Sequence, residues 1–362
     1  MENSISEKRF SQIKKASEDA KSLGIKDRSQ IVEAIIDAES AQKKGILDIS
    51  ESEARGIHSI ANKNIRGEAL DVQERAINKY FEFGQGDKNV TILVDAIHAV
   101  IPNQEEVKFL YKQVSNGDNN SLDKRKEIEK EIKKQFADES TGIIAKTVAE
   151  NVNASYLIAN RSKAFSEANR YWWKREEKSL KSANDESVAP YEYSRRVRAA
   201  MFWAIDKVLH DQGNLDSEKK LTKPFYRIAV HGMDDNPDFD FAIAGSRDIA
   251  SEESIQLFNK LLVSEIDNSD LRVNGLNPSV VIAKKEDPKT KKYSGAASLN
   301  HYRKDVSEEN FQHPSFGENF QNIQLEISAR LRKNDNNREK IISILTNVLK
   351  RLNREGANLQ QI

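Results

Sequence analysis

The spacing of apolar residues changes close to residue 89, and the change separates two kinds of predicted structure. Before it, the stretch from Ile31 to Ala38 places its apolar residues at helical spacing, with polar residues between them. Ser50 with Glu53 has the spacing of a capping box, which marks a helix start. Residues 1–86 are therefore predicted to form an all-helical N-terminal extension that packs on the main domain or on a partner chain.

From residue 89 onward, short apolar and β-branched runs alternate with longer amphipathic stretches. The predicted strands are Val90–His98, Ala154–Ala159, Phe225–His231, Ser279–Ala283 and Ile323–Ile327, with a further apolar segment at Phe239–Gly245. The predicted helices are Thr141–Val152, Arg195–His210, Ser251–Val263 and Asn337–Arg354. Alternation of this kind indicates an α/β domain over residues 87–362, built on a mixed, mostly parallel sheet flanked by helices. The polar stretch 102–138 is predicted to be a helical insertion.

Composition narrows the classes of protein that fit this pattern. The chain has 57 Lys and Arg residues and 57 Asp and Glu residues, and this balance argues against a nucleic-acid-binding protein. It has no cysteine, which leaves histidine and carboxylates as the available metal ligands. The N-terminus is polar and no apolar run is long enough to span a membrane, so we expect a soluble, cytoplasmic protein.

Polar residues stand where three predicted strands end. His98 closes the first strand, His231 ends another with Gly232 beside it, and Glu326 interrupts the last. The carboxyl ends of parallel strands form the ligand-binding edge of an open α/β sheet, and a glycine there lets a ligand approach. Each residue also has a structural explanation, as a turn histidine or as a glutamate on the wet face of a strand. In a covered sheet, however, a buried carboxylate must be paired or functional, so the three together favour a site.

Two histidines and a carboxylate are a common ligand set for a catalytic zinc, which keeps one position open for water. Such a site also needs a general base, and cationic or amide groups that hold a substrate carboxylate and the developing oxyanion. Candidates for these parts lie between the two histidines, at Asp138-Glu139, Asn160-Arg161 and Asn169-Arg170.

The order of these motifs resembles the N-formylglutamate amidohydrolase-like proteins, which are similar in turn to zinc carboxypeptidases. The motifs are His98-Ala-Val, the acid-x-x-Thr-Gly ending at Gly142, Asn160-Arg161, His231-Gly-Met with Asp238-x-Asp-x-x-Ile-x-Gly245, and Gln-Leu-Glu326-Ile-Ser-x-x-Leu-Arg332. The resemblance covers roughly residues 90–332 and leaves out the N-terminal helices. It implies a phosphorylase/hydrolase-like fold.

The resemblance also implies roles for the matched residues. His98 and His231 would ligate zinc. The carboxylate ligand would be Asp138 or its neighbour Glu139, and spacing favours Asp138. Glu326 would be the general base that activates water and later protonates the leaving amine.

Three further residues take substrate-binding roles from the same resemblance. Arg161 would polarise the scissile carbonyl or bind a carboxylate. Asn169 and Arg170 match a pair that grips the terminal carboxylate of the substrate, a task that suits the planar, bidentate guanidinium.

The chain departs from the family pattern in three places. Ile97 stands where members tend to have proline before the first histidine, and Glu167 stands where they often have aspartate. The compact His-x-x-Glu spacing of the carboxypeptidases is absent after His98, so Glu105 and Glu106 remain rival carboxylate ligands.

Other polar residues have weaker links to the site. His301 and His313 are candidates to line the pocket, because they lie in the polar stretch before the last strand. Asp234 and Asp235 either orient the second ligand histidine or are simply solvated. His210 ends a helix, where a structural role is expected.

Taken together, these features predict a zinc-dependent hydrolase of an amide bond in a carboxylate-bearing substrate, such as an N-acyl amino acid or a small peptide. The alternative is a catalytically inactive hydrolase-like binding module whose helical extension supplies an interaction surface. A metal-dependent phosphoesterase ranks lower, because no second metal cluster is visible. We expect no nucleic-acid or membrane partner, and we leave open a homo-oligomer formed through the N-terminal helices.

Overall fold

The computed structural model describes most of the predicted α/β domain. The described residues are 77–101, 138–160, 200–245, 250–294 and 319–356, with short gaps at 79, 202–203, 206, 213–214 and 218–220, and with 104, 107, 126 and 127 as isolated residues. The predicted helical extension up to residue 76 and most of the predicted insertion at 102–138 lie outside the described residues.

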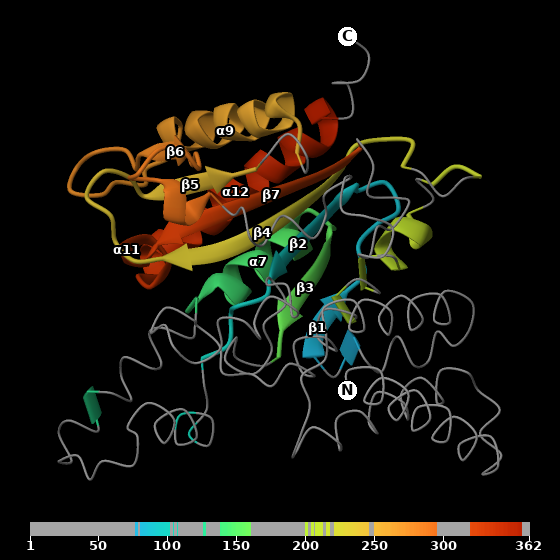
Figure 1. Ribbon diagram of the computed structural model, residues 1–362, viewed down its shortest axis with the longest axis horizontal. Helices are drawn as coiled ribbons and strands as arrows, with labels where there is room; N and C mark the ends of the chain where they lie inside the picture. The colour runs from blue at the N-terminus through green and yellow to red at the C-terminus, as the bar shows by residue number, and fades with distance from the viewer. Residues whose placement is uncertain are drawn as a thin grey trace, which may run out of the picture. The chain divides into compact units, whose positions relative to one another are not determined.

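A seven-stranded sheet with the order β1-β3-β2-β4-β7-β5-β6 forms the centre of this domain (Figure 1). The strands are β1 (Phe81–Gly84), β2 (Ile92–Ala96), β3 (Ser155–Ala159), β4 (Phe225–Met233), β5 (Phe241–Ala244), β6 (Val280–Ile282) and β7 (Phe320–Ser328). The four central strands β3, β2, β4 and β7 run parallel. β1 is antiparallel to β3, and β5 is antiparallel to β7. The predicted mixed, mostly parallel sheet is therefore confirmed.

Because β1 belongs to the sheet, the α/β domain starts earlier in the chain than the sequence predicts. Residues 81–84 pair with β3 at one edge of the sheet, with Phe81 opposite Ala159, although the sequence pattern places them in the helical extension. Four residues are at the lower limit of length at which alternation identifies a strand. The compact unit that carries the sheet begins at Ile77 rather than after residue 86.

Three amphipathic helices cover one face of the sheet: α7 (Thr141–Asn151), α9 (Glu252–Asp267) and α12 (Asp335–Glu355). α9 and α12 are in contact and lie side by side in Figure 1, and α7 packs on β2 and β3. The apolar residues of all three helices join alternate strand residues in a single core. Those from β2, β4 and β7 are Ile92, Val94, Ala96, Tyr226, Ile228, Val230, Ile323, Leu325 and Ile327. Two short elements complete the order, η2 (Lys291–Tyr293) and α11 (Ala329–Arg332).

The opposite face of β2, β4 and β7 carries polar side chains. Successive side chains of a strand point to opposite faces, so the positions between the core residues belong to this second face. They include Asp95, Arg227, His231, Asn322, Gln324 and Glu326, all of which are buried. Buried polar groups require partners or a function. The same three strands therefore supply the apolar core on one face and the candidate site on the other.

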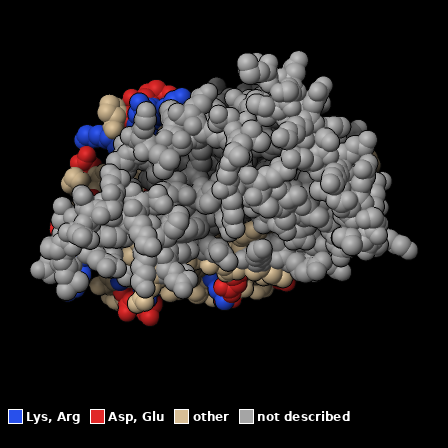
Figure 2. Space-filling view, turned by 60° about the horizontal axis from the view of Figure 1, so that its bottom comes forward, with Lys and Arg blue, Asp and Glu red and all other residues tan. Residues whose placement is uncertain are grey.

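Basic and acidic residues are mixed on the part of the described surface that Figure 2 shows. In Figure 2, lysine and arginine atoms lie beside aspartate and glutamate atoms along the edges of the view. This mixing agrees with the equal numbers of basic and acidic residues. Among the described helices, none is long and apolar enough to cross a membrane.

Two adjacent isoleucines of α7 test the packing of the core. Ile144 is completely buried against the sheet, whereas Ile143 is 57% exposed. Ile144→Ala should lower the free energy of unfolding by about 2–5 kcal/mol, because it removes buried methyl groups and leaves a cavity. Ile143→Ala, a matched control in the same helix, should change it by less than about 0.5 kcal/mol. Denaturant unfolding of both variants gives the comparison, and equal losses would contradict this packing.

Candidate active site

The carboxyl ends of three adjacent parallel strands bring together the residues that the sequence singled out. His98 follows β2 by two residues, His231 lies near the end of β4, and Glu326 lies near the end of β7. The chain passes from β2 to β3 on one side and then to β4 on the other side of β2. The strand order therefore reverses between β2 and β4, the place where open α/β sheets bind their ligands.

His231 and Glu326 are direct neighbours in the register of β4 and β7. Paired residues of neighbouring strands point to the same face of a sheet, so the imidazole and the carboxylate share the polar face. Both side chains are buried, at 4% and 8% exposure.

Asp138 completes a cluster with the two histidines. Its backbone N–H donates to the carbonyl of His98 at 2.8 Å, which places the acidic residue beside the end of β2. The Asp138 Oδ2 lies 3.1 Å from the Nδ1 of His231 and 3.6 Å from the Nδ1 of His98. The two imidazoles meet edge to face, with centroids 4.9 Å apart. One carboxylate oxygen is therefore shared between two buried histidines.

These donor atoms fit a zinc ion. Ligand atoms of His98, Asp138 and His231 all lie within 4.8 Å of one another. Tetrahedral zinc with bonds of about 2.0–2.1 Å holds neighbouring ligand atoms about 3.3 Å apart, and the two oxygen-to-nitrogen distances lie on either side of that value. Two imidazole nitrogens and one carboxylate oxygen also match the chemistry of a catalytic zinc, with a further position left for water.

Of the two acidic residues that the sequence proposes as the third ligand, only Asp138 lies in this cluster. The Glu139 carboxylate instead forms an ion pair with Lys333 at 2.8 Å, and its side chain is 46% exposed. The alternatives Glu105 and Glu106 lie outside the described residues.

Glu326 has the surroundings of a carboxylate with raised proton affinity. Burial raises the pKa of its carboxyl group, and the nearby Asp138 adds to the rise, whereas His231 opposes it. Its Oε1 accepts a hydrogen bond from the Nε2 of Gln324 at 2.6 Å. Gln324 stands two residues earlier on the same face of β7, so it holds the Glu326 carboxylate in one orientation.

Arg332 is a buried residue at the site whose role the sequence did not indicate. Its guanidinium donates to the carbonyls of Ile327 at 3.2 Å, Met233 at 3.4 Å and Glu139. Burial lowers the pKa of this guanidinium, and the nearby carboxylates, Asp138 first among them, oppose that effect.

Gly232 makes room for this guanidinium. A Cβ at residue 232 would lie 2.6 Å from the Cζ of Arg332, so a side chain there would force the guanidinium to move. The sequence suggested that this glycine admits a ligand beside His231. Among the described residues, it is the guanidinium of Arg332 that occupies the space.

A buried ion pair lies on the same face of the sheet as the cluster. Asp95 of β2 pairs with Arg227 of β4, and the Arg227 Nη1 donates to the Oδ1 of Asn322 at 2.9 Å. Burial raises the pKa of the Asp95 carboxyl group, while Arg227, His231 and His98 act in the opposite direction. In the sequence, Arg227 stands out only as a charged residue within the apolar run of β4.

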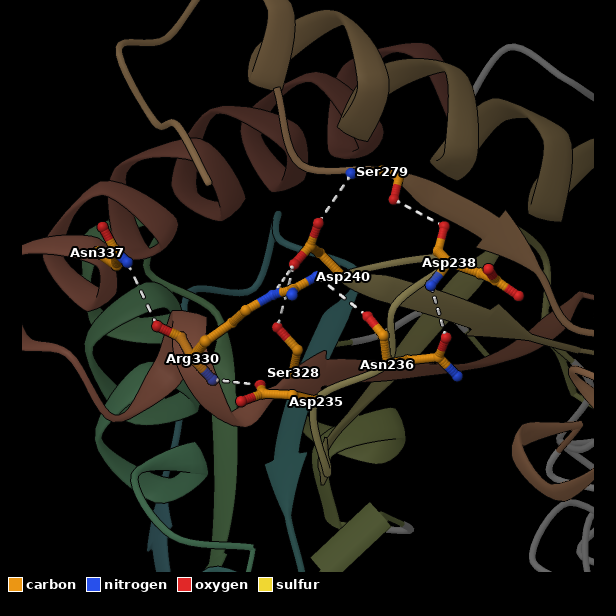
Figure 3. A network of polar contacts seen from close by, with 8 residues as sticks. All are labelled: Asp235, Asn236, Asp238, Asp240, Ser279, Ser328, Arg330 and Asn337. Carbon is orange, nitrogen blue, oxygen red and sulfur yellow. Dashed lines mark hydrogen bonds and ion pairs between the residues drawn. The ribbon is translucent and has the colours of Figure 1, made fainter. Parts of the chain in front are cut away.

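The acidic loop after β4 has a structural role. Asp235 accepts the backbone N–H of Arg330 at 2.6 Å, and the Arg330 Nε donates to Asp240 at 2.7 Å (Figure 3). Asp240 also accepts from the backbone N–H of Ser279 at 3.1 Å. Asp234 is exposed, and Asp235 binds the start of α11 rather than serving only as a solvated turn residue.

The remaining predicted site residues are not placed. Arg161, Asn169, Arg170, His301 and His313 lie outside the described residues. By contrast, the side chain of His210 is described and is 83% exposed beside Asp211, as expected for a histidine without a site role.

Comparison with known proteins gives structural likeness without a sequence match. No protein-family model matches the chain, and no curated protein does. Among solved structures, N-formylglutamate amidohydrolase from Ralstonia eutropha gives a TM-score of 0.48 at 13% identity, over 76% of this chain and 98% of that chain. A gene product of Agrobacterium tumefaciens gives a TM-score of 0.44 at 13% identity, over 78% of this chain and 96% of that chain. A bacteriophage poly-gamma-glutamate hydrolase gives a TM-score of 0.33 at 12% identity, over 82% of this chain and 94% of that chain. The first of these proteins carries the family name to which the sequence motifs point. At these scores, the function of this chain has to be inferred from its own residues.

Proposed function

We propose that this protein is a zinc-dependent hydrolase that cleaves an amide bond in a carboxylate-bearing substrate. The observation that carries the proposal is the convergence of His98, Asp138 and His231 beside Glu326, at the carboxyl ends of β2, β4 and β7. Two nitrogen donors and one oxygen donor around a shared point are suited to holding zinc, and a second carboxylate, that of Glu326, is suited to proton transfer.

His98, Asp138 and His231 would hold the ion. Zinc in such a site supplies a Lewis acid that polarises the scissile carbonyl and makes water nucleophilic near neutral pH. The chain's own contribution is to fix the ligands: Asp138 is tied by its backbone to His98, and its carboxylate lies against His231.

Glu326 would carry the protons. As a carboxylate it accepts a proton from the attacking water, and as a carboxylic acid it returns that proton to the nitrogen that leaves. Its hydrogen bond from Gln324 holds the carboxylate, and its position opposite His231 puts it on the same face of the sheet as that ligand.

Recognition of the substrate carboxylate is assigned from the sequence resemblance. Arg161 would bind the scissile carbonyl or a carboxylate, and Asn169 with Arg170 would hold the terminal carboxylate. These roles imply an N-acyl amino acid, N-formylglutamate among them, or a small peptide as the substrate.

Zinc binding by the purified protein tests the ligand assignment. The protein should bind about one zinc per chain, and a chelator should remove both the metal and any activity. His231→Ala should abolish stoichiometric binding, because it removes one of the donors in the cluster. His210→Ala, a histidine variant on the exposed surface, should bind zinc as the unmodified protein does. Metal analysis after dialysis makes the comparison, and equal zinc contents in the two variants would contradict the site.

Glu326→Gln tests the proton-transfer role. The amide keeps the size of the side chain but cannot take a proton, so the variant should retain zinc and lose at least about 100-fold in kcat on N-acyl amino acids or peptides. Glu265→Gln is the control, because Glu265 is a partly buried glutamate that pairs with Arg351 at 3.0 Å outside the site. Full turnover by Glu326→Gln would rule out this mechanism. Zinc binding without hydrolysis of any such substrate by the unmodified protein would favour the inactive binding module.

A further inference from the structure

The loop that carries Asp138 is held in an unusual backbone conformation. Ser140, two residues later, has φ 70° and ψ −6°, in the left-handed region that residues other than glycine rarely adopt. Such a conformation persists only when the surrounding contacts hold it. Within the loop, Thr141 contributes by donating from its Oγ1 to the carbonyl of Asp138 at 2.6 Å.

Arg332 holds the same loop from outside. Its Nη1 donates to the carbonyl of Glu139, between the ligand Asp138 and the strained Ser140. The two partners are 193 residues apart in the sequence. This bond joins the loop to the end of β7, from which α11 and Arg332 emerge.

The same guanidinium also reaches the other strand ends of the site. Its Nη2 donates to the carbonyl of Met233, two residues after the ligand His231, and its Nε donates to Ile327, the residue after Glu326. A rigid planar group with three such bonds fixes the relative positions of the segments that it joins. Gly232 is part of the arrangement, since a methyl group there would overlap the guanidinium.

We infer that Arg332 is the positioning residue of this site, which sets Asp138 and His231 at the separation that a metal ion requires. The inference rests on the proposed function for the identity of the ligands. Within the described residues, the guanidinium of Arg332 donates to three backbone carbonyls, so its role is to orient the ligands rather than to bind substrate.

Three variants disturb this arrangement in different ways. Arg332→Met removes the guanidinium, Arg332→Lys keeps the charge but loses the planar fork, and Gly232→Ala displaces the guanidinium without altering it. Each should weaken zinc binding by about 10- to 100-fold, measured by chelator competition on the full chain, as is typical when partners that orient metal ligands are lost. In the metal-free protein, each should speed amide hydrogen exchange at residues 138–141, because the loop loses its outside contact.

Two matched controls separate positioning from general stability. Arg330→Met removes another arginine of α11, one whose bonds run to Asp240 and Asn236 instead of the ligand loop (Figure 3). Gly245→Ala introduces a methyl group 2.6 Å from Ile255, an overlap as close as the one at Gly232 but in the apolar core. Both should lower the melting temperature while leaving zinc affinity and exchange at residues 138–141 unchanged.

The outcomes distinguish this inference from the proposed function. If the Arg332 and Gly232 variants lose only thermal stability, like the controls, the positioning role is overturned while the zinc site stands. If the unmodified protein binds no zinc, the proposed function fails, and hydrogen exchange at residues 138–141 still decides whether Arg332 holds the loop. Arg332→Lys is the mildest of the three changes. If Arg332→Met does not fold, the comparison of Arg332→Lys with the controls decides whether Arg332 positions the ligands.

Discussion

The parallel register of β4 with β7 is the constraint on which the site and the core both depend. It sets His231 opposite Glu326 on one face and Val230 opposite Leu325 on the other. A shift of one residue in either strand would send its polar set into the apolar core and its apolar set to the site. The apolar residues that α7, α9 and α12 cover therefore fix the register, and the register in turn brings a histidine and a carboxylate together.

Burial of a polar face on central strands is unfavourable unless its charges are compensated. Asp95 forms an ion pair with Arg227, and Gln324 donates a hydrogen bond to Glu326, so these carboxylates are compensated within the sheet. A buried ion pair of this kind is rarely better for stability than apolar residues of similar volume. The polar face is therefore better explained by the candidate site at its carboxyl end than by folding, which agrees with the location of the His98, Asp138 and His231 cluster.

Local patterns in the sequence were enough for the sheet and for part of the site. Alternation in β7 and the apolar run of β4 identified both strands, and the polar residues at their ends proved to be neighbours. Patterns of this kind did not separate Asp138 from Glu139, because a loop has no periodicity to show which side chain points inward. Only the fold shows that Glu139 pairs with Lys333, far along the chain, whereas Asp138 lies against the two histidines. β1 escaped prediction for a related reason, since its four residues gain their strand conformation from pairing with β3.

Arg332 shows the limit of such reasoning most clearly. Its partners are backbone carbonyls, which carry no mark of residue type, and they come from three segments that only the fold brings together. The glycine after His231 was the one visible trace of this contact. A glycine at a strand end signals that something approaches the backbone closely, but not what approaches. At Gly232 the approaching group belongs to the chain itself, so the space beside His231 is filled by the guanidinium that joins the ends of β4 and β7 to the loop of Asp138.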